Sequence, residues 1–175
     1  MTLLLPLALL APIVLLAVAA IAATRPTIRP GQLPRLAEAA AFAGLGLALA
    51  GVGQLLIQGP STLSFGSGVG LLAFRLDAVS TTMALLVSFV GWIVVRYART
   101  YLDGEAREGA FHGLLLATLA AVLVLVQAGS LGVLVLAFLA VGVGLRQLLL
   151  FYRDRPEARR AAAKFSLVWG AGMWL

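Results

Sequence analysis

The sequence predicts an all-α protein, a polytopic bundle of transmembrane helices. Of its 175 residues, 62% are hydrophobic and 11% are charged, and the mean hydropathy is +1.04. In a soluble domain about a quarter of the residues are charged. The apolar residues form runs of about 20, which is long enough for a helix to cross a hydrocarbon core of about 30 Å. Basic and uncharged connections alternate between these runs, as expected of consecutive membrane spans.

We predict one transmembrane domain over residues 1–175, with five spans and the start of a sixth. Its helices are expected at about 3–23, 36–57, 78–95, 111–128, 131–152 and 162–175. The first run has no Lys or Arg before Arg25, which favours a retained helix over a cleaved signal peptide.

The connections predict the orientation of the spans. Residues 24–35 contain three arginines and no acid, residues 96–112 contain three arginines, and residues 153–164 contain five basic residues against two acids. Residues 58–70 and 127–130 carry no charge. Because positively charged loops stay in the cytoplasm, we expect a multi-pass protein of the cell inner (plasma) membrane with its N-terminus outside.

The composition also excludes several kinds of metal site, cofactor and partner. The chain has no cysteine and one histidine, so disulfides, iron–sulfur clusters and Cys-ligated zinc are excluded, and we expect no metal site and no cofactor. The basic residues lie in short loops between apolar runs, where they set topology. We therefore expect membrane lipid around the chain and no nucleic-acid partner.

Three ionisable residues near the predicted helix ends have both a structural and a functional interpretation. Glu38 lies about one turn inside the second span, where Arg35 could neutralise it. Asp77 would form an interfacial ion pair with Arg75 or start a helix, unless it belongs to an ion pathway. His112, where a loop meets the fourth span, is either a solvated or capping histidine or a proton relay. The structural interpretation is preferred for each.

Arg146 is the sharpest anomaly of the sequence. It falls inside the predicted fifth span, about two turns from the basic end of that span. A charge there costs several kcal/mol unless it is paired, hydrated or able to snorkel to the headgroups. A buried acid such as Glu38 could be its partner, and the structural and functional interpretations both stay open.

Three segments carry a resemblance to a known family. They are FRLDAVSTTM (74–83), the run from Gln127 to Tyr152, and RPEARRAAAKF (155–165). Together they resemble the N-terminal part of antiporter-like proton-translocating membrane subunits, a family that includes subunit L of respiratory complex I and the large subunits of multisubunit cation/proton antiporters. The segment LRQLLLFYRDRPEARRAAAKF (145–165) is most similar to the membrane subunit of the DAB inorganic-carbon accumulation complex. The resemblance covers about residues 70–170.

The resemblance implies a bundle in which charged residues at mid-membrane pass protons. In the DAB branch this flux would drive uptake or hydration of inorganic carbon by a separate zinc-containing partner. Respiratory members have a glutamate in the fifth span, and Leu139 stands at that position here. Lys164 matches a basic position at the start of the sixth span, and Asp77 matches the acid that opens the third. With Glu38, His112 and Arg146, they are the candidate relay or charge-compensating residues.

The sequence therefore predicts the N-terminal portion of a proton-conducting subunit in an ion-gradient-driven inorganic-carbon (bicarbonate/CO2) uptake complex. Other membrane subunits and a large zinc-containing subunit are the expected partners. One alternative is a subunit L-like proton-translocating subunit of an NADH:quinone oxidoreductase, or a cation/proton antiporter subunit. Another is a non-conducting structural or assembly subunit. We expect no catalytic chemistry in the chain itself, whether or not it serves a translocase.

Overall fold

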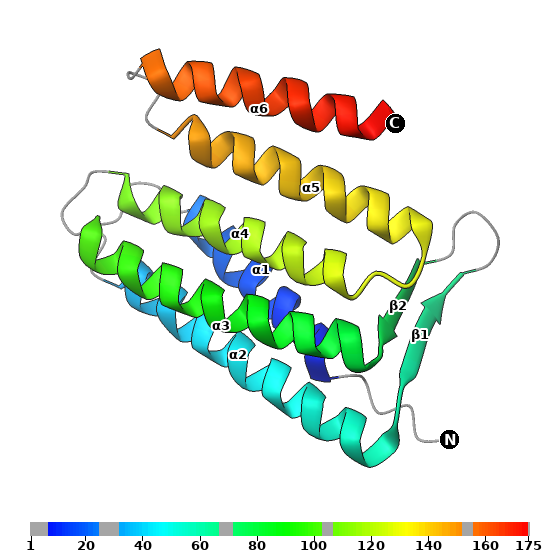
Figure 1. Ribbon diagram of the computed structural model, residues 1–175. Coiled ribbons are helices and arrows are strands. Elements are labelled where there is room, and N and C mark those ends of the chain that lie inside the picture. Colours follow the sequence, from blue (N-terminus) through cyan, green and yellow to red (C-terminus); the bar gives the residue numbers. More distant parts are fainter. Residues whose placement is uncertain (1–6, 25–31, 67–71, 103–106, 152–155, 175) are drawn as a thin grey trace.

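The computed structural model describes residues 7–24, 32–66, 72–102, 107–151 and 156–174. They form a helical bundle with a two-stranded sheet at one end (Figure 1). The elements in chain order are a short 3-10 helix at Leu7–Leu9, α1 (Leu10–Thr24), α2 (Leu33–Gln58), β1 (Ser61–Phe65), β2 (Leu72–Leu76), α3 (Ala78–Tyr101), α4 (Glu108–Val126), α5 (Leu131–Leu149) and α6 (Pro156–Trp174).

The first four helices form a unit with a common core, and the last two are added to it as successive layers. α1 packs on α2 and α4, and α3 packs on the same two helices; α5 then packs on α4, and α6 on α5 (Figure 1). The core shared by α1, α2, α3 and α4 is built mainly from small and branched residues, among them Leu15, Ala41, Ala84, Leu116 and Leu123. Small side chains let helix backbones approach closely in lipid.

The prediction of an all-α polytopic membrane bundle is confirmed. Within the described residues, five helices are long and apolar enough to cross a membrane: Leu7–Thr24, Leu33–Gln58, Ala78–Tyr101, Glu108–Val126 and Leu131–Leu149. α6 is not one of these five, because its first half carries several charged residues. It begins at Pro156, earlier than the expected start at 162.

Two close helix contacts depend on glycine. A Cβ atom at Gly113 of α4 would lie 2.9 Å from the Cβ of Ala22 on α1. A Cβ atom at Gly144 of α5 would overlap the hydroxyl oxygen of Thr118 on α4. The apolar runs of α1, α4 and α5 can therefore approach at these points only because no side chain intervenes.

The sequence did not predict the β-hairpin. The uncharged connection between the second and third helices contains β1 and β2, which pair antiparallel with Ser61 opposite Leu76 and Phe65 opposite Leu72. Gly59 has φ +77°, a backbone conformation that favours glycine, and it lets the chain turn from α2 into β1. The hairpin lies at the end of the bundle where α3 begins (Figure 1).

The hairpin is tied to the turn between α4 and α5. The N–H of Gly129 donates to the carbonyl oxygen of Ala73 at 2.7 Å, and the N–H of Arg75 donates to the carbonyl oxygen of Gln127 at 2.9 Å. The buried side chain of Gln127 adds a third connection, since its Nε2 donates to the carbonyl oxygen of Ala8 at 3.2 Å. These bonds join the start of the chain, the hairpin and the α4–α5 turn into one unit.

Candidate functional site

The two ends of the bundle differ in charge. The C-terminal ends of α1, α3 and α5 meet the N-terminal ends of α2, α4 and α6 at the end opposite the hairpin, which we call the basic end (Figure 1). These helices carry their cations at or toward it: Arg35, Arg96, Arg99, Arg107, Arg146, Arg159, Arg160 and Lys164. At the hairpin end the described residues include one cation, Arg75. The loop arginines 25, 29, 153 and 155 lie outside the described residues.

Glu38 forms an ion pair between α2 and α3 at the basic end. Its carboxylate accepts a hydrogen bond from the Nη1 of Arg99, and its other oxygen lies 3.9 Å from the Nε of Arg96. The Glu38 side chain is 20% exposed, so it lies mostly inside the protein. The Arg96 guanidinium also lies 5.6 Å from the ring centre of Trp92. The two arginines compensate the charge of an acid close to the end of a membrane-spanning helix.

Arg35, the cation considered as the partner of Glu38, does not pair with it in the described structure. Arg35 is exposed in the first turn of α2, and the cations that neutralise Glu38 come from α3 instead. Arg146, the other cation considered for Glu38, is not its partner either, because the Glu38 carboxylate pairs with Arg96 and Arg99.

The position expected for Arg146 needs correction as well. α5 ends at Leu149, where the N–H of Leu150 donates to the carbonyl oxygen of Arg146, so Arg146 is in the last helical turn and not two turns inside. Its side chain is exposed. A cation in the last turn of a helix interacts favourably with the helix dipole and is close enough to the headgroups to snorkel. This geometry supports the structural interpretation of Arg146.

Lys164 lies in the first half of α6 and is exposed in the described structure.

Asp77 lies at the opposite end of the bundle, and its carboxylate caps the N-terminus of α3. One oxygen accepts from the backbone N–H of Ser80 at 2.8 Å, the Ser80 hydroxyl accepts from the N–H of Asp77 at 2.9 Å, and the other carboxylate oxygen lies 2.8 Å from the Nε of Arg75. The expectation of an ion pair or a helix start is thus confirmed in both respects.

The same contacts determine the acidity of Asp77. The hydrogen bond from the backbone N–H of Ser80 has the largest effect and lowers the pKa of Asp77. Desolvation opposes it, and the Ser80 hydroxyl and the Arg75 charge lower the pKa further. Asp77 therefore stays ionised at neutral pH as the N-cap of α3.

His112 is buried, which contradicts the expectation of a solvated histidine. α4 begins at Glu108, so His112 lies in its second turn and is 1% exposed. The Nδ1 atom lies 3.0 Å from the carbonyl oxygen of Glu108. Because a carbonyl oxygen only accepts, Nδ1 must carry a proton, and in a neutral ring Nε2 is then an acceptor. The described residues provide no hydrogen-bond partner for Nε2.

The five candidate residues do not converge. Glu38 and His112 belong to the basic end, Asp77 belongs to the hairpin end, and Arg146 and Lys164 are exposed on α5 and α6. The described residues also bring no three His, Asp or Glu side chains close enough to hold a metal ion. The local arrangement provides one compensated acid, Glu38, and one buried imidazole, His112, at the basic end.

Sequence reasoning missed two structural features of the basic end. Arg96 and Arg99 are three residues apart on α3, a spacing that places both side chains on one helix face and could have indicated a common acidic partner. Glu108 falls in the predicted loop 96–112, but it is the first residue of α4 and is 2% exposed.

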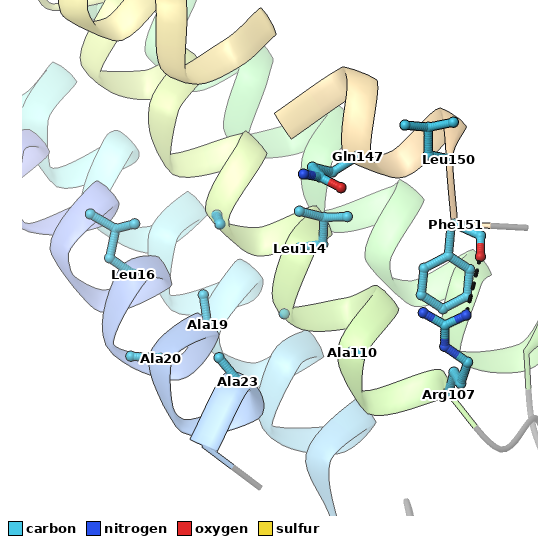
Figure 2. A pocket seen from close by; sticks show the side chains of 12 residues that line it. Leu16, Ala19, Ala20, Ala23, Arg107, Ala110, Leu114, Gln147, Leu150 and Phe151 are labelled. Atoms are coloured by element: carbon cyan, nitrogen blue, oxygen red, sulfur yellow. Dashed lines mark hydrogen bonds between the residues drawn. The ribbon is translucent and has the colours of Figure 1, made fainter. Parts of the chain in front are cut away.

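A groove with a volume of about 540 Å³ opens between α1, α4 and the end of α5 near the basic end (Figure 2). Its walls are mostly apolar, with Ala20 and Ala23 from α1 and Leu114 from α4. Arg107 and Gln147 are polar groups on its lining. Arg107 is held against Phe151, with its guanidinium carbon 4.9 Å from the ring centre and Nη1 donating to the Phe151 carbonyl oxygen at 3.4 Å (Figure 2).

Part of the chain matches a known protein family. Residues 64–112 match the family described as NADH-ubiquinone oxidoreductase (complex I), chain 5 N-terminus. This segment includes β2, α3 and the start of α4 up to His112. The matched segment contains FRLDAVSTTM, one of the three segments in which the sequence resembles antiporter-like membrane subunits.

The chain is also similar in sequence to two DabB proteins. It is 37% identical over 169 residues to the probable inorganic carbon transporter subunit DabB2 of Halothiobacillus neapolitanus, a match that covers 89% of this chain and 31% of the relative. It is also 32% identical over 87 residues to the probable inorganic carbon transporter subunit DabB of Hydrogenovibrio crunogenus, covering 49% of this chain and 17% of the relative. The chain thus spans less than a third of the length of these relatives.

A solved structure shares the fold. A chain of the membrane-bound sulfane sulfur reductase, an archaeal respiratory membrane complex, matches with a TM-score of 0.66 at 22% identity, over 85% of this chain and 23% of that chain. At this identity the match supports the arrangement of the helices alone.

Proposed function

We propose that this chain forms the N-terminal part of a proton-conducting membrane subunit in an ion-gradient-driven complex for inorganic-carbon uptake. The observation that carries the proposal is the 37% identity to the DabB2 subunit of Halothiobacillus neapolitanus, because it extends over 89% of the chain. The polytopic helical fold agrees with a role in transport across a membrane.

The structure suggests different roles for the candidate residues. His112 is the best relay candidate, because its imidazole is buried and Nε2 can accept a proton. Glu38 compensates charge through Arg99, and Asp77 does so through Arg75 while it caps α3. Arg146 and Lys164 are exposed on the two outer helices, where further segments or subunits could contact them.

We propose the cell inner membrane as the location, with the basic end in the cytoplasm and the N-terminus outside. The arginines of that end support this orientation through the positive-inside tendency. The expected partners are other membrane subunits and a large zinc-containing subunit, which would carry out the carbon chemistry that this chain lacks.

A complementation experiment tests this proposal. The gene is expressed with its neighbouring genes in cells that grow only at elevated CO2. Growth at ambient CO2 that depends on this gene, together with co-purification of a large zinc-containing protein, is the expected result. Insertion without growth and without any such partner would overturn the proposal. The protonophore sensitivity of the uptake tests whether an ion gradient drives it.

A respiratory subunit is the second candidate, because residues 64–112 match the complex I chain 5 family. For this function the same purification should recover quinone-reductase subunits. Deletion of the gene would then lower NADH-dependent quinone reduction in membranes and leave growth at ambient CO2 unchanged.

A further inference from the structure

We propose that the groove between α1, α4 and the end of α5 binds an anionic phospholipid, with an acyl chain along the groove and the phosphate at Arg107. The groove has a volume of about 540 Å³, within the range of about 300–1,000 Å³ that is usual for small-molecule sites. This inference is independent of the proposed transport function.

The apolar part of the groove fits an acyl chain and is open to the bilayer. The side chains that line its floor are small, because α1 contributes alanines. Gly113 of α4 has no side chain, so α4 approaches Ala22 closely. Leu16 lines the groove and is 47% exposed, and its neighbour Ile13 on the same membrane-spanning helix is 59% exposed. An acyl chain can therefore enter sideways from the hydrocarbon region.

The polar part of the groove fits a phosphate. The cation–π contact and the hydrogen bond with Phe151 fix the guanidinium of Arg107 on the lining (Figure 2). A guanidinium has five N–H donors, and this bond occupies one. The side chain is exposed, so the other donors can reach a ligand. Glu108, the adjacent acid, is 2% exposed and does not line the groove.

The position of Arg107 also matches the depth of a headgroup. Arg107 is the N-cap of α4 at the basic end, where a membrane-spanning helix leaves the hydrocarbon, while Leu114 lies two turns further along the same helix. A cation at the rim and an apolar channel toward the membrane centre match the two parts of a phospholipid. A second groove of about 360 Å³ between α3, α4 and α5 lacks a charged lining residue, so no headgroup class is assigned to it.

The test measures lipid binding to the purified full chain, with any subunits that co-purify. Phosphatidylglycerol and phosphatidylcholine with identical acyl chains are titrated, and bound lipid is counted by native mass spectrometry. We expect the parent to prefer phosphatidylglycerol. Arg107→Gln should weaken phosphatidylglycerol binding about tenfold, the effect of one charge-assisted contact worth about 1.4 kcal/mol, while Arg107→Lys should retain part of the preference. Inorganic phosphate at the same concentration should not compete.

Two matched controls separate the groove from general effects. Arg160→Gln removes an exposed cation of the same end that does not line the groove, and it should leave the preference unchanged. Ala20→Phe fills the groove and should weaken binding of both lipids, whereas Ala17→Phe, at an exposed alanine of α1 outside the groove, should not.

Three results would overturn the inference. The first is equal binding of both lipids by the parent, and the second is an equal effect of Arg107→Gln and Arg160→Gln. The third is an Ala20→Phe variant that keeps its lipid and loses a co-purified subunit, because a protein segment would then occupy the groove. An unchanged thermal unfolding midpoint shows that each variant is folded.

Discussion

The carboxylate of Glu38 on α2 accepts a hydrogen bond from the guanidinium of Arg99 on α3, a contact between residues 61 positions apart in the chain. The charge of an acid on α2 is therefore neutralised by a cation on the neighbouring helix α3. A carboxylate that is 20% exposed needs such compensation, because an unpaired charge in this position would be expensive.

We expect Glu38→Gln to destabilise the protein by about 1–2 kcal/mol, between the values for exposed and for fully buried pairs. The variant leaves Arg96 and Arg99 facing one another without an acid. Thermal unfolding in detergent measures the loss, and a double-mutant cycle with Arg99→Gln gives the coupling energy. Arg35→Gln, on the exposed side of the same helix, is the control with little expected effect. A coupling energy near zero would show that the pair contributes nothing.

A substitution of His112 tests whether this residue relays protons. We expect His112→Leu to insert and fold with a small change in stability, because a buried group with one local hydrogen bond is replaced by an apolar one. Proton flux in proteoliposomes containing the complete complex should fall at least about a hundredfold, the lower end of the range for a lost acid–base group. Thr118→Val is the matched control on α4, since the Thr118 hydroxyl bonds only within its own helix in the described structure. Flux equal to that of the parent would remove His112 from the pathway.

The lowered pKa of Asp77 should make the stability of the protein depend on pH. The pKa of Asp77 is lowered by the Ser80 N–H, so ionised Asp77 stabilises the folded state above the unfolded pKa of about 4, and this contribution is lost as the pH falls through the lower folded value. Asp77→Ala should cost about 0.5–2 kcal/mol at pH 7, as for other N-caps, and less at pH 3. Unfolding midpoints at the two pH values give the comparison. A cost that does not change with pH would mean that the charge has no part in the cap.

The sequence indicated the membrane spans and the start of α3, because both depend on local residues. Runs of apolar residues give the span lengths, and Asp77 followed by Ser80 gives the cap. The hairpin was missed because β1 consists of two serines, one threonine, one leucine and one phenylalanine beside glycines. Its pairing with β2 depends on backbone bonds that composition does not reveal.

The candidate site was harder to predict for two physical reasons. Ion pairs such as Glu38 with Arg99 depend on which helices pack together, and a single sequence holds no direct record of that. Helix ends were also displaced: α5 ends at Leu149 although the apolar run continues to Phe151, and α4 begins at Glu108 within a charged loop. These shifts of one turn moved Arg146 to a helix end and His112 into the interior.

The contact between Gly144 and Thr118 provides the last test, because it concerns the packing of α5 on the four-helix unit. A Cβ atom at Gly144 would overlap the Thr118 hydroxyl oxygen and lie 3.1 Å from the Thr118 Cβ. Gly144→Ala should therefore destabilise the protein by about 1–3 kcal/mol, the usual cost of overpacking. Thr118→Ala removes the overlapping atoms, so the double variant should regain most of the loss in a thermal unfolding assay. Gly132→Ala on the same helix has no atom within 4 Å and should cause no destabilisation. Equal effects of the two glycine substitutions would mean that helix propensity, and not the approach of α5 to α4, decides the outcome.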